Sequence, residues 1–299
     1  MRLPVLVAFL VSGACARGGA PNQDNVDASP VGDGGNADAR ALTPDAPSGP
    51  TPDAPSGGGG SSTLLLTEVV LAPSTQEFVE IANPGTTAVD LSTYYLSDSG
   101  SYFRLPAGVP TLDSADFIVK FPAGASIAPG AVITVALDTT ANFMTTNGVA
   151  PTYSVASGTM TAVAANGIPS LTNSGELVVL FKWDGQADLV KDVDAVLAGA
   201  PTIANGFVDK SSIALDGPDT GTSAASYASD ARTMAAMGST PASGKSTKRL
   251  ALETGHETQS GGGNGISGDD ETSEDTAATW DSSAFTSPTP GSVPAALLP

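Results

Sequence analysis

The sequence predicts an all-β protein, a sandwich of short antiparallel strands. Between residues 64 and 97, short β-prone runs alternate with breaks at Pro73 and at 83–85, which reads Asn-Pro-Gly. Within the second run Val79 and Ile81 fall on one face, as the two-residue repeat of a strand requires. Further runs of strand length recur to about residue 197, and helix-like composition is confined to one segment.

The runs follow one another at short intervals. They are 64–71, 77–81, 89–91, 94–96, 117–119, 132–137, 177–181 and 192–197. Residues 177–181 are almost continuously apolar, which favours a central strand, and 192–197 alternates with Val193, Ala195 and Leu197 on one face. The last two runs predict a hairpin through the loop at 184–188. At most one short helix is expected, at 224–237, and long loops between about 140 and 245.

The order of several short motifs resembles the lamin tail domain. The motifs are Leu65-Leu66-Thr67-Glu68-Val69, Glu77-Phe78-Val79-Glu80-Ile81-Ala82-Asn83, Val89-Asp90-Leu91 with Tyr95-Leu96-Ser97-Asp98, Phe121-Pro122-Ala123-Gly124 with Ile127-Ala128-Pro129-Gly130, Ser246-Thr247-Lys248-Arg249, and Pro288-Thr289-Pro290-Gly291. The resemblance covers about residues 62–291 and implies an immunoglobulin-like β-sandwich with loop insertions in its later half. It also implies an interaction module rather than an enzyme, similar to bacterial secreted forms with a lipoprotein-like leader.

Residues 1–15 have the layout of a secretory signal: Arg2, an apolar run to Val11, and small residues before Cys15. The apolar run is too short to span a bilayer. Cys15 is the only cysteine and lies where a lipoprotein peptidase would make a new N-terminus, although Ser12 replaces the usual leucine. Cleavage after Ala16 would instead remove Cys15. Lipidation of Cys15 is favoured, and both alternatives predict an exported protein, either a cell-envelope lipoprotein or an extracellular one.

Residues 16–62 are rich in Pro, Gly, Asp, Ala and Ser, and the sequence TPDAPSG occurs at 43–49 and again at 51–57. Such a segment buries too little apolar surface to offset its ordering entropy, so we expect a disordered linker that acts as a spacer. The sandwich is then expected at 63–291, followed by a flexible tail at 292–299.

The formal net charge of −19 argues against nucleic acid as a partner, because phosphate neutralisation needs clustered Lys and Arg. A catalytic triad would have to use the sole histidine, His256, yet no Gly-x-Ser-x-Gly elbow is present. Residues 243–247 mimic the end of a phosphate-binding loop without its leading glycine. The sequence therefore predicts no catalytic residue, and a secreted hydrolase or nuclease is the weakest alternative.

One acidic loop is a candidate calcium site, the only cofactor that the sequence suggests. Its carboxylates are Asp269, Asp270, Glu271, Glu274 and Asp275. Carboxylates this close repel one another, and calcium, which takes six to eight oxygens, would relieve the repulsion. A second, weaker set is Asp184, Asp188, Asp192 and Asp194. The alternative for both is a solvated acidic surface.

Two further groups have a structural and a functional interpretation. Tyr94, Tyr95, Tyr102 and Phe103 would suit a sugar-binding platform, but their alternation favours packing. Arg249 is expected to pair with a carboxylate at a sandwich edge rather than with a ligand.

Together these features predict a non-catalytic binding or structural module at the cell surface, exported and tethered to the membrane only through a lipid on Cys15. A calcium-stabilised adhesin or carbohydrate-binding module is the main alternative. The expected partner is a protein or a surface polysaccharide, and the expected state is a monomer.

Overall fold

The computed structural model describes residues 64–227, 236–252, 272 and 276–298. The leader with Cys15, the linker, His256 and all five carboxylates of the first acidic set lie outside these residues. In the part described, no helix is long and apolar enough to cross a bilayer.

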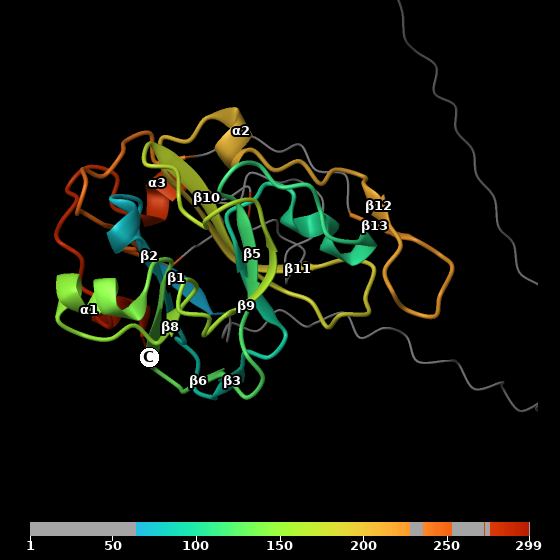
Figure 1. Ribbon diagram of the computed structural model, residues 1–299, viewed down its shortest axis with the longest axis horizontal. Coiled ribbons are helices and arrows are strands. Elements are labelled where there is room, and N and C mark those ends of the chain that lie inside the picture. Colours follow the sequence, from blue (N-terminus) through green and yellow to red (C-terminus); the bar gives the residue numbers. More distant parts are fainter. Residues whose placement is uncertain (1–63, 228–235, 253–271, 273–275, 299) are drawn as a thin grey trace, which may run out of the picture. The chain divides into compact units, whose positions relative to one another are not determined.

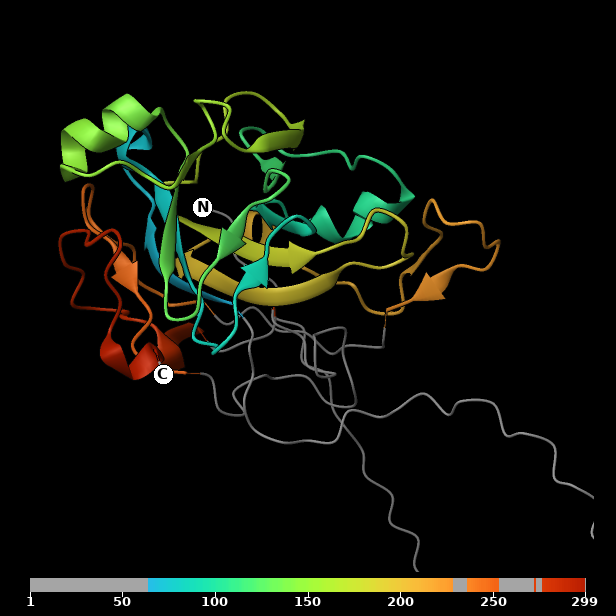
Figure 2. The same ribbon diagram turned by 90° about the horizontal axis from the view of Figure 1, so that it is seen from below.

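Two five-stranded sheets form the body of the domain (Figure 1). The first has the order β14 (Thr247–Lys248), β1 (Leu65–Val70), β2 (Phe78–Ala82), β7 (Val132–Ala136) and β8 (Tyr153–Ser154). The second has the order β11 (Lys191–Gly199), β10 (Gly175–Lys182), β4 (Tyr94–Ser97), β5 (Phe117–Lys120) and β9 (Thr161–Ala165). All neighbours are antiparallel except β7 and β8. The all-β prediction is confirmed, and so is the β10–β11 hairpin, yellow in Figure 2.

Two short antiparallel pairs complete the described strands: β3 (Val89–Asp90) with β6 (Ser126–Ile127), and β12 (Ala214–Leu215) with β13 (Ala225–Ser226). Short helical segments connect them. These are η1 (Ser74–Gln76), η2 (Tyr102–Ala107), α1 (Thr140–Asn147), α2 (Ile203–Gly206), α3 (Thr276–Thr279) and η4 (Ala295–Leu297).

The expectation of at most one short helix, at 224–237, is wrong. The described part of that segment contains β13, and the longest helix is α1 instead. Thr139 caps α1 by accepting a bond from the Asn142 amide at 3.2 Å, and Gly148 ends it with a φ of 72°. Phe143 is its only buried residue, so α1 lacks the repeated apolar positions by which a helix is recognised.

The second sheet is buried on both faces. Its inner face contributes Leu96, Phe117, Val119, Val178 and Leu180 to the sandwich core, where they meet Leu66, Val79, Ile81 and Val135 of the first sheet. Its outer face contributes Tyr95, Ile118, Leu177, Val179 and Phe181 to an outer core, covered by η2 and by residues 208–227. Burial on both faces explains why residues 177–181 read as one apolar run.

The chain returns to the first sheet at its end. The amide of Thr289 donates to Glu68 at 3.0 Å, and that of Gly291 donates to Glu80 Oε2 at 2.5 Å. Burial raises the pKa of Glu80 to about 7, and the Gly291 amide opposes this shift. The turn at 288–291 therefore covers the outer face of β1 and β2. Val79 and Ile81 point to the opposite, inner face, which forms the sandwich core.

Candidate functional site

A bulge in β11 places two aspartates on opposite faces of one strand. Leu180 of β10 pairs with Asp194, and the next residue, Phe181, pairs with Asp192, so Val193 is an extra residue. Val193 packs in the sandwich core, whereas Ala195 lies in the outer core. The predicted shared face of Val193 with Ala195 is therefore wrong, because the alternation slips by one residue at the bulge.

On the inner face, Asp194 and Arg249 form what we call the inner pair. Arg249 Nη2 lies 2.5 Å from Asp194 Oδ1, and Arg249 Nε donates to the Leu66 carbonyl at 2.9 Å. Asp194 Oδ2 accepts the Leu66 amide at 2.5 Å. Both side chains are at most 2% exposed. The pair joins β11 to β1 and to the residue after β14, at one edge of both sheets, and confirms the structural role predicted for Arg249.

On the outer face, Asp192 and Lys210 form the outer pair. The Lys210 ammonium donates to Asp192 Oδ2, and the two side chains are 0% and 1% exposed. The Tyr102 hydroxyl donates to Asp192 Oδ1 at 2.6 Å and accepts from Lys210 Nζ at 3.0 Å. Nothing in the sequence around Lys210 indicates burial, and the sequence analysis missed this residue.

The second acidic set does not form one site. Asp192 and Asp194 belong to the two ion pairs. Asp184 turns the β10–β11 loop by accepting the amides of Gln186 and Ala187 at 2.9 and 2.8 Å. These bonds lower the pKa of Asp184. Only Asp188 approaches other carboxylates.

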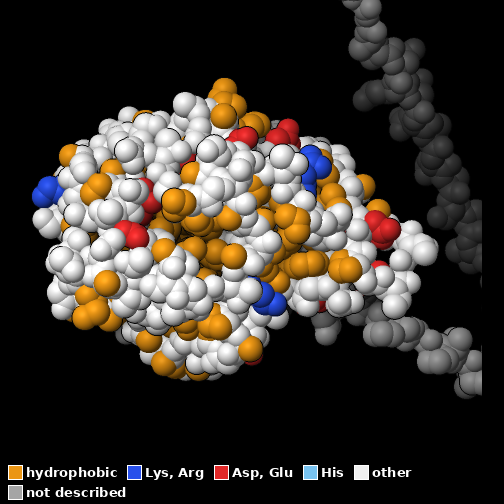
Figure 3. All heavy atoms as spheres, in the orientation of Figure 1, with side chains coloured by type: hydrophobic (Ala, Val, Ile, Leu, Met, Phe, Trp, Pro, Cys, Tyr) orange, Lys and Arg blue, Asp and Glu red, His pale blue; other side chains and the backbone are white. Residues whose placement is uncertain are grey.

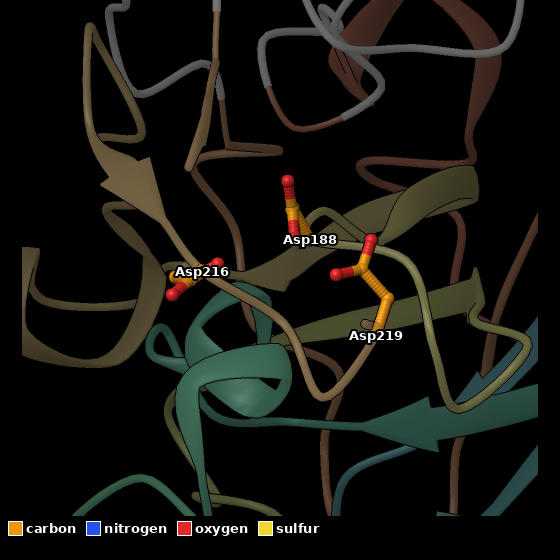
Figure 4. A group of neighbouring side chains, drawn as sticks. All are labelled: Asp188, Asp216 and Asp219. Atoms are coloured by element: carbon orange, nitrogen blue, oxygen red, sulfur yellow. The ribbon is translucent and has the colours of Figure 1, made fainter. Parts of the chain in front are cut away.

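Asp188, Asp216 and Asp219 have carboxylate oxygens that all lie within 4.8 Å of one another (Figure 4). Asp188 comes from the β10–β11 loop, and the other two follow β12. Asp216 and Asp219 are exposed and Asp188 is half-buried. Oxygen ligands of this kind suit a hard cation such as calcium, and solvated acids also gather in this way without one.

Three buried carboxyl groups, the acidic end cluster, lie at one end of the sandwich: Glu77, Asp98 and Glu176, each at most 2% exposed. Burial raises the pKa of Glu77 and of Glu176 to about 7 and that of Asp98 well above its usual range. Glu77 Oε2 accepts the Leu171 amide at 3.0 Å, and Glu176 Oε2 accepts the adjacent Thr172 amide at 3.1 Å. Among the described residues, no lysine or arginine forms an ion pair with these three.

The four aromatic residues considered for a sugar-binding platform pack against other side chains instead. Tyr95, Tyr102 and Phe103 are at most 3% exposed and belong to the outer core. Tyr95 stacks on Phe181 with ring centroids 5.1 Å apart. Only Tyr94 of the four is half-buried, so the packing interpretation is confirmed for the other three.

An open hollow with a mixed polar and apolar lining lies beside the edge strand β9. It is lined by Val109, Pro110, Thr111, Leu112 and residues 163–166. Val109 is 67% exposed, and Ile168, just beyond the lining, is 83% exposed. Figure 3 shows hydrophobic side chains gathered over the part of this face where β5 and β9 lie in Figure 1. Exposed apolar surface of this kind is typical of a binding region.

The segment that mimics a phosphate-binding loop has another role. Gly244 turns with a φ of 74°, and residues 246–249 then run along β1 as an edge strand with isolated bridges beside it. No helix follows in the described residues up to 252, so this segment lacks the strand-to-helix context of a phosphate-binding loop.

Residues 59–196 match the family model described as Lamin Tail Domain, a family of non-catalytic immunoglobulin-like domains. Among curated proteins none matches the chain. The solved structure of a DUF4876 family protein from Bacteroides thetaiotaomicron is similar at 16% identity and a TM-score of 0.36, over 69% of this chain. The chain spans 65% of the length of that protein, just under two thirds. Residues 59–196, a little under half of the chain, are thus identified as a lamin tail domain.

Proposed function

We propose that this protein is an exported, lipid-tethered and non-catalytic module that presents a lamin tail sandwich to a partner at the cell surface. The observation that carries the proposal is the open hollow beside β9, with the exposed side chain of Val109 in its lining, on a lamin tail domain. The hollow is bounded by the edge strand β9, and an exposed sheet edge suits the addition of an extended protein segment. A protein or a surface polysaccharide is the partner class proposed.

The buried charges support the non-catalytic assignment. Arg249 and Lys210, the two fully buried cations of the described residues, each hold an aspartate and are closed off from solvent. A catalytic group must reach a substrate. A screen for hydrolase and nuclease activity with and without EDTA tests this, and metal-dependent turnover would contradict it.

Cys15 and the linker at 16–62 support the tether. The decisive experiment is labelling with a palmitate analogue in cells that express the wild type or Cys15→Ala. We expect label and membrane retention only in the wild type. Unlabelled wild type found in the medium would mean a freely secreted protein and would remove the tether from the proposal.

Calcium stabilisation is a second candidate, favoured by the close oxygens of Asp188, Asp216 and Asp219. The measurement is thermal melting in calcium and in chelator for the wild type, for Asp216→Asn with Asp219→Asn, and for a variant with the carboxylates of 269–275 neutralised. Loss of the calcium shift in one variant would locate the site. Equal melting temperatures of the wild type in calcium and in chelator would exclude stabilisation by calcium.

A further inference from the structure

The outer pair differs from an ordinary ion pair in its surroundings. Lys210 and Asp192 are at most 1% exposed and lie against the outer core. The Tyr102 ring, which contacts both, packs against Phe103 and Phe181 at centroid separations of 6.0 and 5.1 Å. An amine and a carboxyl group are therefore held together where water is excluded.

Burial makes charge costly for both members of this pair. Taking two opposite charges out of water costs several kcal/mol for each ion. Passing one proton from the ammonium to the carboxylate removes both charges and leaves a neutral amine beside a neutral carboxylic acid. A neutral lysine amine is a nucleophile, and the carboxyl group that Nζ contacts, through Oδ2, is that of Asp192.

We propose that Lys210 and Asp192 become joined by an isopeptide bond. The lone pair of Nζ forms the bond to Cγ, and one Cγ–O bond breaks. The departing oxygen leaves as water, with one proton from the acid and one from the amine. Amine and acid thus give amide and water, and no oxidant, reductant or other reactant is required.

Tyr102 is placed to assist the attack of Nζ on Cγ. Its hydroxyl donates to Asp192 Oδ1 at 2.6 Å, so it stabilises the negative charge that grows on that oxygen when Nζ attacks. It also accepts from Lys210 Nζ at 3.0 Å and so orients the amine, whose own bond to Asp192 Oδ2 can carry a proton to the oxygen that leaves as water. The inner pair has no such chemistry, because the guanidinium of Arg249 stays protonated.

The bond would fasten the loop around Lys210 to β11, and with it the covering of the outer core. This inference goes beyond the proposed function, since it depends on neither the leader nor a partner. A covalent clamp of this kind resists proteolysis and force in the way that a disulfide does, without cysteine.

Tryptic digestion of the denatured full-length wild type tests the bond directly. Trypsin cleaves after Lys191 and after a free Lys210, which gives the peptide 192–210. An acylated Lys210 is not cleaved, so the bonded protein gives the peptide 192–232, lighter by one water molecule. Mass spectrometry should find that lighter peptide. Recovery of 192–210, or of 192–232 at its full sequence mass, would overturn the proposal.

Two variants sharpen the result. Lys210→Arg keeps the positive charge and the trypsin site but not the nucleophilic amine, and it should give only the peptide 192–210 at full mass. Tyr102→Phe should raise the unbonded fraction in freshly prepared protein. An unchanged fraction in Tyr102→Phe would remove the role of Tyr102, while the wild-type digest alone decides whether the bond forms.

Discussion

On the inner face of β11, Asp194 forms an ion pair with Arg249, the residue after the edge strand β14. On the outer face, two residues earlier, Asp192 forms an ion pair with Lys210, which lies in a loop. The arginine also binds the Leu66 carbonyl and so fixes the register of two sheet edges. The lysine ammonium donates to side-chain oxygens of Asp192 and Tyr102. The planar guanidinium of Arg249, which can donate several hydrogen bonds, thus links the two sheets, and the compact ammonium of Lys210 links the covering loop to β11.

Arg249→Met breaks the inner pair and should have the largest effect. It leaves Asp194 buried without its cation, which costs about 3–5 kcal/mol of unfolding free energy. Urea denaturation measures this loss. The double variant Arg249→Met with Asp194→Asn is the control, because it removes both charges and should recover part of the stability. A double variant as unstable as the single one would mean that packing, not charge, is lost.

Lys210→Met removes the outer pair together with the proposed isopeptide bond and should cost about 2–4 kcal/mol, because Asp192 keeps the Tyr102 hydroxyl as a partner. The effect should be local: amide hydrogen exchange should quicken in residues 208–227 and stay slow in β1 and β2. Lys210→Arg, which retains the charge, should be less destabilising. Equal exchange rates throughout would show that the covering and the sandwich unfold as one unit.

The two pairs also show what the sequence could and could not predict. Arg249 was predicted to meet a carboxylate because it belongs to a recognisable strand motif. Lys210 has no such context, and its partner is set by chain packing across the outer core. The bulge at Val193 was invisible because a two-residue repeat fits the residues on either side of it, and only pairing with β10 shows the slip. Helix α1 was missed for want of a second buried position.

The acidic end cluster differs from both ion pairs, because among the described residues no lysine or arginine pairs with its buried carboxyl groups. Burial holds the pKa of Glu176 at about 7, above its unfolded value near 4.5, and nearby Asp116 adds to the shift. The folded chain therefore binds this proton more tightly than the unfolded chain does. Stability conferred by the proton is complete below about pH 4.5 and is lost as pH rises through 7.

For wild type in chelator, the unfolding free energy should fall between pH 5 and pH 8 by about 2–3 kcal/mol for each carboxyl group shifted in this way. Glu77, whose pKa is also about 7, contributes in the same direction. Glu176→Gln carries no titratable proton at this position, so its stability should fall less over the same range. Chemical denaturation at both pH values checks this, and an equally steep fall in the variant would contradict the assignment to Glu176.

Tyr227→Phe should have the smallest effect and separates charge from neutral hydrogen bonding on the outer face. The Tyr227 hydroxyl accepts the Val190 amide at 3.1 Å and donates to the Phe103 carbonyl at 3.1 Å, so it holds the same covering as Lys210 does. Its loss should cost about 1 kcal/mol by urea denaturation, because both bonds are between neutral groups. A cost equal to that of Lys210→Met would mean that the outer pair contributes no more than a neutral contact. Of the two ion pairs, the inner pair alone would then contribute to the unfolding free energy through its charges.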